Sequence, residues 1–143
     1  MTRVTDTKTE ELKKIARRWI EEGWVRGNVE IVDELHAPDF VDRDSSGREP
    51  TNAGFKKAIL EVYAAFPDFN CKVEDLVVEP QTGKVAVRWS AIGTHRGKYL
   101  NASPTGRKIH FKGIEIITVK NGKITERWGE WDGIDLLGQL GVI

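Results

Sequence analysis

The sequence predicts an α+β protein in which helices near the amino terminus pack on one face of a strongly curved antiparallel sheet, forming a cone-shaped fold that encloses a pocket. Three observations support this fold. Apolar residues recur at helical spacing over the first half of the chain, the period falls toward two from Cys71 onward, and Asn121-Gly122 marks a tight hairpin. The 143 residues contain no linker or repeat, so residues 1–143 are expected to form a single domain.

Three helices are expected before the sheet. The first carries an apolar stripe with helical spacing, made of Leu12, Ile15, Ala16, Trp19 and Ile20. Asn28 can cap a second, short helix that ends before Pro38. Thr51 or Asn52 can cap a third helix, which Pro67 terminates because proline cannot continue a helix.

Four strands are expected in the second half of the chain, where β-branched and aromatic residues dominate. They are Val73 to Val78, Val85 to Thr94, Ile109 to Val119 and Ile124 to Trp131. The segment Lys98 to Arg107, which contains Ser103-Pro104-Thr105-Gly106, is predicted to form a longer loop at a sheet edge or pocket mouth. A short segment, Gly133 to Leu140, closes the fold.

The charge balance indicates a small or neutral partner. Lys and Arg together number 22 and Asp and Glu also number 22, so no strong field attracts nucleic acid or an anionic membrane. The chain has no apolar run long enough for a membrane span and no early signal segment, so a cytoplasmic protein is expected. The single cysteine, Cys71, is interpreted as a buried structural residue.

No metal or cofactor is expected. His36, His95 and His110 are isolated in the sequence, whereas zinc sites use clustered ligands. The segment 42–47 imitates the start of a calcium loop, but Ala53 occupies the twelfth position, where a bidentate Glu is needed, so a polar turn is predicted there. The chain also lacks a Gly-rich phosphate loop and a nucleophile elbow, which disfavours nucleotide cofactors and covalent catalysis.

The last predicted strand carries the strongest catalytic candidates. Alternation places Glu126, Trp128, Glu130 and Asp132 on one face of that strand. If this face lined an apolar pocket, desolvation would raise the pKa of a carboxyl group toward the range useful for acid/base catalysis, with Asp132 and Glu130 as the catalytic pair. The alternative is that the glutamates are solvated or paired with Arg127 or Arg88, and that Asp132 merely caps Gly133 to Leu140.

Other candidate substrate-binding residues lie elsewhere in the chain. Arg88 could bind a carboxylate of a ligand or pair with Glu115 or Glu130 across the sheet. His95 stands at one end of the predicted loop and could titrate near the pocket mouth. Trp19 and Trp128 are predicted to wall the cavity, and Glu115 is a further substrate-binding candidate.

Four segments occur in the order seen in one known family: Ala65-Phe66-Pro67-Asp68-Phe69, Gly93-Thr94-His95-Arg96-Gly97, Pro104-Thr105-Gly106-Arg107 and Asn121-Gly122-Lys123-Ile124-Thr125-Glu126-Arg127-Trp128. With Trp131-Asp132 and the closing segment Leu136 to Gly141, the chain resembles the SnoaL-like polyketide cyclase (ester cyclase) family of the nuclear-transport-factor-2-like superfamily. The resemblance implies the cone-shaped fold shared with ketosteroid isomerase, commonly dimeric through the sheet. It also implies that an aspartate on the last strand is the acid/base of a cofactor-free intramolecular aldol reaction, and Asp132 matches its place. Many relatives carry histidine at the positions of Arg127 and Arg43.

These observations leave three functions open. In the first, a homodimeric enzyme uses Asp132 to remove a proton next to a carbonyl of an apolar small molecule, with Arg88 or Glu130 tuning the charge. In the second, the same cavity binds an apolar metabolite in a non-catalytic dimeric module. A minor alternative is a hydrolase or isomerase that uses the same aspartate.

Overall fold

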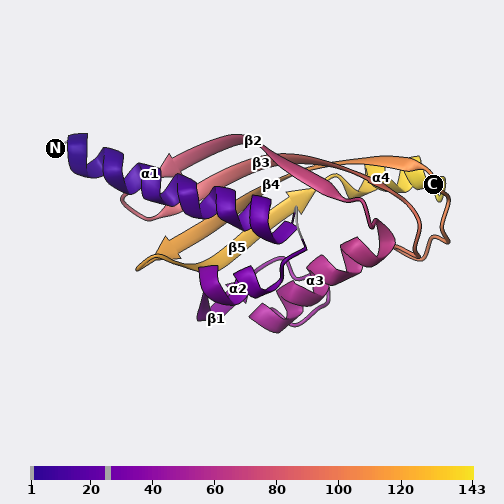
Figure 1. Cartoon of the computed structure of the whole chain (residues 1–143), viewed down its shortest axis with the longest axis horizontal. Coiled ribbons are helices and arrows are strands. Elements are labelled where there is room, and N and C mark those ends of the chain that lie inside the picture. Colours follow the sequence, from indigo (N-terminus) through magenta and orange to yellow (C-terminus); the bar gives the residue numbers. More distant parts are fainter. Residues whose placement is uncertain (1, 25–26) are drawn as a thin grey trace.

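The computed structural model describes residues 2–24 and 27–143, with side chains from residue 7 onward, and it confirms the α+β class. Helices pack on one face of a five-stranded sheet that does not close into a barrel (Figure 1). The helical elements are α1 (Thr2–Arg18), the π-helix η1 (Trp19–Trp24), α2 (Glu30–Leu35), α3 (Asn52–Ala65) and α4 (Gly133–Leu140). The strands are β1 (His36–Asp42), β2 (Asn70–Glu79), β3 (Lys84–Thr94), β4 (Lys108–Lys120) and β5 (Lys123–Trp131).

The sheet has the order β1-β5-β4-β3-β2, and the four strands expected from the sequence form its antiparallel part. A fifth strand, β1, which the sequence does not predict, extends this antiparallel part and runs parallel to β5. Pro38, expected to lie just beyond the second helix, lies inside β1. A proline is tolerated here because β1 is an edge strand, where one side of the backbone needs no sheet partner.

Local signals in the sequence place most of the other boundaries. The Thr51 side chain caps α3 by accepting a hydrogen bond from the Gly54 N–H at 3.3 Å. Asn121 and Gly122 both adopt positive φ, 51° and 76°, as a tight hairpin turn requires. The first helix begins at Thr2 and continues into η1.

The core lies between the helices and the inner face of the sheet. Trp19 of η1 stacks on Phe55 of α3 with ring centroids 5.7 Å apart, and Phe66 contacts Phe111 of β4 edge-on at 4.9 Å. These contacts fix α3 and η1 relative to the sheet, and both elements contribute walls to the pocket described below. In the described part of the chain, no helix combines the length and the apolar character needed to cross a membrane.

Candidate active site

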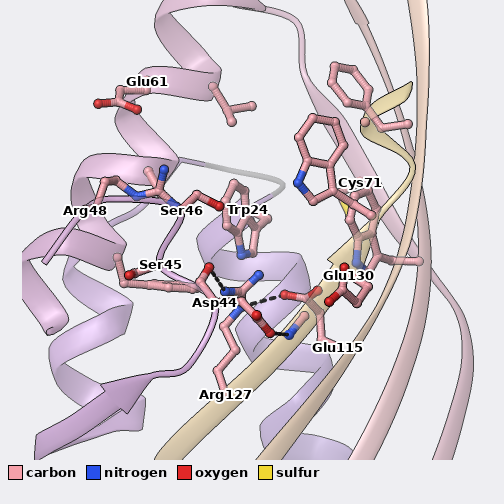
Figure 2. A pocket seen from close by; sticks show the side chains of 18 of the residues that line it. Trp24, Asp44, Ser45, Ser46, Arg48, Glu61, Cys71, Glu115, Arg127 and Glu130 are labelled. Atoms are coloured by element: carbon pink, nitrogen blue, oxygen red, sulfur yellow. Dashed lines mark hydrogen bonds and ion pairs between the residues drawn. The ribbon is translucent and has the colours of Figure 1, made fainter. Parts of the chain in front are cut away.

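A pocket of about 870 Å³ opens between the helical layer and the inner face of the sheet (Figure 2). This volume falls in the usual range for small-molecule sites. Its walls come from η1, α3, the turn that follows β1, and strands β2 to β5. The apolar part of the wall is formed by Ile20, Trp24, Phe55, Ala58, Val62, Phe69, Cys71, Trp89, Tyr99, Leu100, Phe111 and Trp131.

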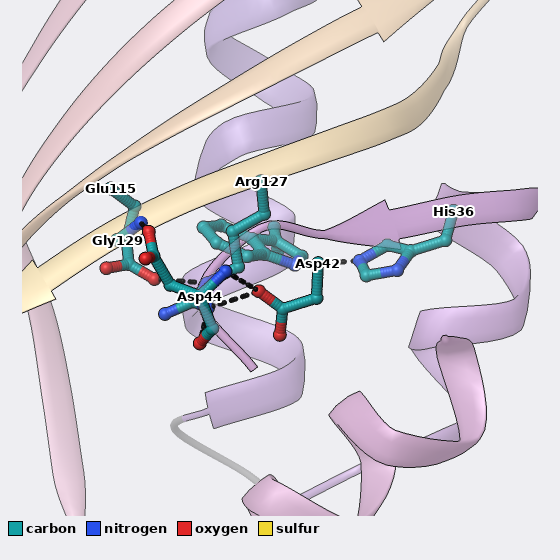
Figure 3. Close-up of polar contacts among 7 residues, drawn as sticks. His36, Asp42, Asp44, Glu115, Arg127 and Gly129 are labelled. Atoms are coloured by element: carbon teal, nitrogen blue, oxygen red, sulfur yellow. Dashed lines mark hydrogen bonds and ion pairs between the residues drawn. The ribbon is translucent and has the colours of Figure 1, made fainter. Parts of the chain in front are cut away.

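Charged residues converge at one side of this pocket, where β5 lies between β4 and β1. The Arg127 guanidinium donates from Nε to Glu115 Oε1 at 2.7 Å and from Nη1 to Asp42 Oδ1 at 2.7 Å (Figure 3). All three side chains are nearly inaccessible to solvent, with exposed fractions of 11% for Arg127, 5% for Glu115 and 1% for Asp42. Two buried carboxylates therefore share one cation.

The turn after β1, residues 43–48, is fastened to this cluster. Asp44 accepts the Gly129 N–H on Oδ2 at 2.6 Å, and its backbone carbonyl accepts from Arg127 Nη1 at 3.2 Å. The Asp44 N–H in turn donates to Asp42 Oδ1 at 3.0 Å. The polar turn expected from the sequence is confirmed, and these bonds hold it against the pocket.

Gly129 makes room for the charged pair. It lies directly opposite Glu115 in the β4–β5 register. A Cβ added at Gly129 would stand 2.4 Å from both Glu115 Oε2 and Arg127 Nη2, closer than real Cβ atoms approach their neighbours. A side chain at position 129 is therefore incompatible with this arrangement. The carboxylate that points into the pocket here is that of Glu115 on β4, and β5 contributes a glycine opposite it.

Burial gives Glu115 an unusual proton affinity. Removal from water raises the pKa of Glu115 to about 7, although the charge and hydrogen bond of Arg127 and a hydrogen bond from Trp89 oppose this rise. For Arg127, burial favours the neutral form, but the two carboxylates outweigh it, and the pKa of the guanidinium is raised overall. Glu115 can therefore exchange a proton near neutral pH while Arg127 stays charged.

The structure places Asp132 and Glu130 differently from Glu115. The Asp132 carboxylate caps α4, accepting from the Asp135 N–H at 3.0 Å, and its side chain is 41% exposed. Its neighbours Trp131 and Gly133 line the pocket, so Asp132 lies beside the rim. Glu130 borders the pocket directly and is exposed.

The other predicted site residues lie apart from one another. Arg88 bonds Asp75 on the outer face of the sheet at 2.9 and 2.7 Å, and Trp128 is half-exposed on the same face. Trp19 is buried in the core and donates from Nε1 to His36 Nε2 at 2.9 Å. His95 is buried under the segment that follows β3, where its Nδ1 accepts the Thr105 N–H at 3.1 Å. Of the seven predicted residues, the pocket lining includes Glu115 and Glu130.

Sequence reasoning missed Arg127 and Asp42 as members of the site. Strand alternation places Arg127, Gly129 and Trp131 on one face of β5, and this face lines the pocket. The sequence-based hypothesis assigned the pocket to the opposite face because that face carries more carboxylates. A usable signal was present: Gly129 interrupts a strand rich in large residues, and an isolated glycine in a strand often marks a close approach of other groups.

Comparison with known proteins agrees with this architecture. The family model of the SnoaL-like polyketide cyclases matches residues 14–140. The chain belongs to the SnoaL-like polyketide cyclase family. A comparison of this family member with curated proteins finds no significant match.

Solved structures of the same family superpose closely on it. A candidate polyketide cyclase from Bacillus cereus is 35% identical, with a TM-score of 0.78 over 93% of this chain and 82% of that one. IdmH from Streptomyces antibioticus, also named as a candidate polyketide cyclase, is 30% identical, with a TM-score of 0.76 over 92% and 98%. A candidate polyketide cyclase from Acidithiobacillus ferrooxidans is 26% identical, with a TM-score of 0.79 over 92% and 95%.

Proposed function

We propose that this SnoaL-like protein catalyses cofactor-independent acid/base chemistry on an apolar carbonyl compound, of the kind that closes a ring by an intramolecular aldol reaction. The observation that carries the proposal is Glu115, a buried carboxylate with a pKa near neutrality in the wall of a largely apolar pocket. A general base works best when its pKa lies near the working pH. Family membership supports the reaction class, and the geometry of the pocket supports Glu115 as the residue that carries it.

In the proposed reaction, ionised Glu115 removes a proton from the carbon next to a carbonyl and leaves an enolate. The enolate carbon attacks a second carbonyl of the same molecule, which forms the new C–C bond and an alkoxide. Protonated Glu115 then returns its proton to that alkoxide, so the protein ends the cycle unchanged. Arg127 holds the Glu115 carboxylate in place throughout, through the 2.7 Å bond from Nε to Oε1.

The first step can be tested without the natural substrate. 2-Acetylnaphthalene is an apolar ketone whose methyl protons exchange slowly with solvent, and the protein is expected to accelerate incorporation of deuterium from D₂O, measured by NMR. This assay reports proton removal alone, so it does not depend on ring closure. Absence of any acceleration, with binding of the ketone shown by calorimetry, would favour the non-catalytic binding module, for which the apolar pocket is equally suited.

Asp132→Asn distinguishes the two candidate bases. Asparagine caps helices about as well as aspartate, so this change removes the charge and keeps α4 intact. With Glu115 as base, the exchange rate of Asp132→Asn should stay within about threefold of wild type, well below the 10²- to 10⁴-fold contribution of a general base. A loss of two orders of magnitude or more in a protein of unchanged melting temperature would instead assign the chemistry to Asp132.

We also propose that two copies associate through the outer face of the sheet. In the register of the strands, Val77, Ala86, Ile116 and Trp128 form a row across β2, β3, β4 and β5. Val77, Ile116 and Trp128 are 67%, 41% and 50% exposed, and in the described part of the chain the helices pack on the opposite face (Figure 1). A continuous apolar row flanked by charged residues such as Arg88 and Asp75 fits a second copy of itself.

The substitution Trp128→Lys should convert a dimer to a monomer, because it removes the largest apolar side chain of this row and places a charge at its β5 end. Leu60→Lys is the matched control, since Leu60 is 54% exposed on α3, away from the sheet. The molar mass measured by light scattering after gel filtration should halve for the first variant only. A monomeric wild-type protein would rule out the dimer.

A further inference from the structure

We propose that the pocket accepts substrates that carry a carboxylate group, which Arg48 binds on the wall opposite Glu115. The inference rests on the proposed use of this pocket as the substrate site, and it adds the chemical class of the substrate. Figure 2 shows Arg48 on the side formed by the turn and α3, with Glu115 on the sheet across the pocket. A substrate held at both ends would present its carbonyl region to Glu115.

Arg48 differs from the other cations of the pocket wall because, among the described residues, its side chain has no hydrogen-bond or ion-pair partner. Arg43 donates from Nε to Glu126 Oε2 at 2.9 Å, and Arg127 is paired with Glu115 and Asp42. The Nε atom of Arg48 is buried and has no hydrogen-bond acceptor among the described residues. A buried, unpaired donor of a charged group carries a free-energy cost, which an anionic ligand would remove.

The backbone presents Arg48 in a fixed position. The Arg48 N–H donates to the Ser45 carbonyl at 3.1 Å, which closes the turn, and Gly47 supplies the positive φ of 86° that the turn needs. The start of the same turn is held by the bond from the Gly129 N–H to Asp44 Oδ2. An arginine whose backbone is already held in place loses less conformational freedom on binding than one on a mobile loop would.

Neighbouring groups favour an anion at this position. Ser45, Ser46 and Tyr99 line the pocket together with Arg48, so three hydroxyl groups that can donate hydrogen bonds share its wall. Burial raises the pKa of Tyr99 despite the opposing charge of Arg48, so this hydroxyl stays protonated and able to donate. Two acidic residues line this side of the pocket, Asp44 and Glu61. The Asp44 carboxylate accepts the Gly129 N–H, Glu61 is exposed, and neither forms an ion pair with Arg48 within the described residues.

The test compares 6-acetyl-2-naphthoate with its methyl ester by calorimetric titration at low salt; the ester lacks the negative charge and is larger by one methyl group. A charge-assisted hydrogen-bonded pair predicts that wild type binds the acid about 10- to 100-fold more tightly than the ester. Arg48→Met should bind the two equally, and Arg48→Lys should keep part of the preference. Arg88→Met is the matched control, because Arg88 lies on the outer face, and it should retain the full preference.

Equal binding of acid and ester by wild type would overturn the inference, as would a preference that survives in a folded Arg48→Met protein. The outcome is independent of catalysis. A protein that prefers the acid but fails to exchange protons of either ketone would disprove the proposed reaction and leave the Arg48 site standing. A protein that exchanges protons but binds acid and ester equally would support the proposed reaction and disprove the Arg48 site.

Discussion

Replacing Glu115 with glutamine is expected to lower the rate of proton exchange into 2-acetylnaphthalene by about 10²- to 10⁴-fold, the contribution of a positioned general base. Glutamine keeps the shape of the side chain and can still accept from Arg127 Nε through its amide oxygen. It cannot remove a proton. Binding of the ketone should therefore change little, and the whole effect should appear in the rate.

Glu130→Gln is the matched control for this change. Glu130 is also a glutamate at the same pocket, but it is exposed. Its substitution should leave the exchange rate close to that of wild type. An unchanged rate in Glu115→Gln, or an equal loss in both variants, would contradict the assignment of Glu115 as the base.

The pH dependence of wild type gives a second readout of the same residue. Because burial raises the pKa of Glu115 to about 7, the exchange rate should rise with pH through that value as the base form appears. The effect of rising pH on the stability of the fold has the opposite sign. Between the ordinary glutamate pKa of 4.5 and about 7, the folded state holds a proton that the unfolded state releases, so this residue lowers the free energy of unfolding as pH rises. Both dependences should be absent in Glu115→Gln.

The sequence predicts the fold better than the site, for physical reasons visible in particular residues. Helices and strands are specified locally, as by Thr51 at the start of α3 and by Asn121-Gly122 between β4 and β5. The strand β1 escaped prediction because its seven residues include a proline and two acidic residues, and its pairing is with β5, far along the chain. Its hydrogen-bond partners could not be read from its own sequence.

The site depends on such distant pairings. Arg127 lies on the inner face only because Asp42 and Glu115, 85 and 12 positions away, both meet its guanidinium. An arginine without buried carboxylate partners is expected to be exposed to solvent. Because those partners are not evident in the sequence, the pattern of β5 favours the opposite face for the pocket. The raised pKa of Glu115 likewise follows from burial, which the pattern of β4 could not reveal.

Arg127→Met is expected to destabilise the fold by about 3–5 kcal/mol at pH 8, because it removes one partner of a buried ion cluster and strands the others. Methionine has a similar length, so the volume is nearly kept. The cost comes from the carboxylates of Asp42 and Glu115, whose exposed fractions are only 1% and 5%. Urea denaturation monitored by tryptophan fluorescence measures it.

The loss in Arg127→Met should shrink as pH falls from 8 to 5. The pKa of Glu115 is already raised by burial, and removal of the neighbouring cation should raise it further, so the folded variant binds a proton in this range and gains stability from acid. The double variant Arg127→Met/Glu115→Gln should recover part of the loss at pH 8, since it removes one of the two uncompensated charges. Arg127→Lys keeps a cation and should lose less than Arg127→Met. A loss that is independent of pH and unaffected by the second substitution would mean that packing against Phe55, whose ring centroid lies 5.6 Å from the guanidinium carbon, outweighs the charges.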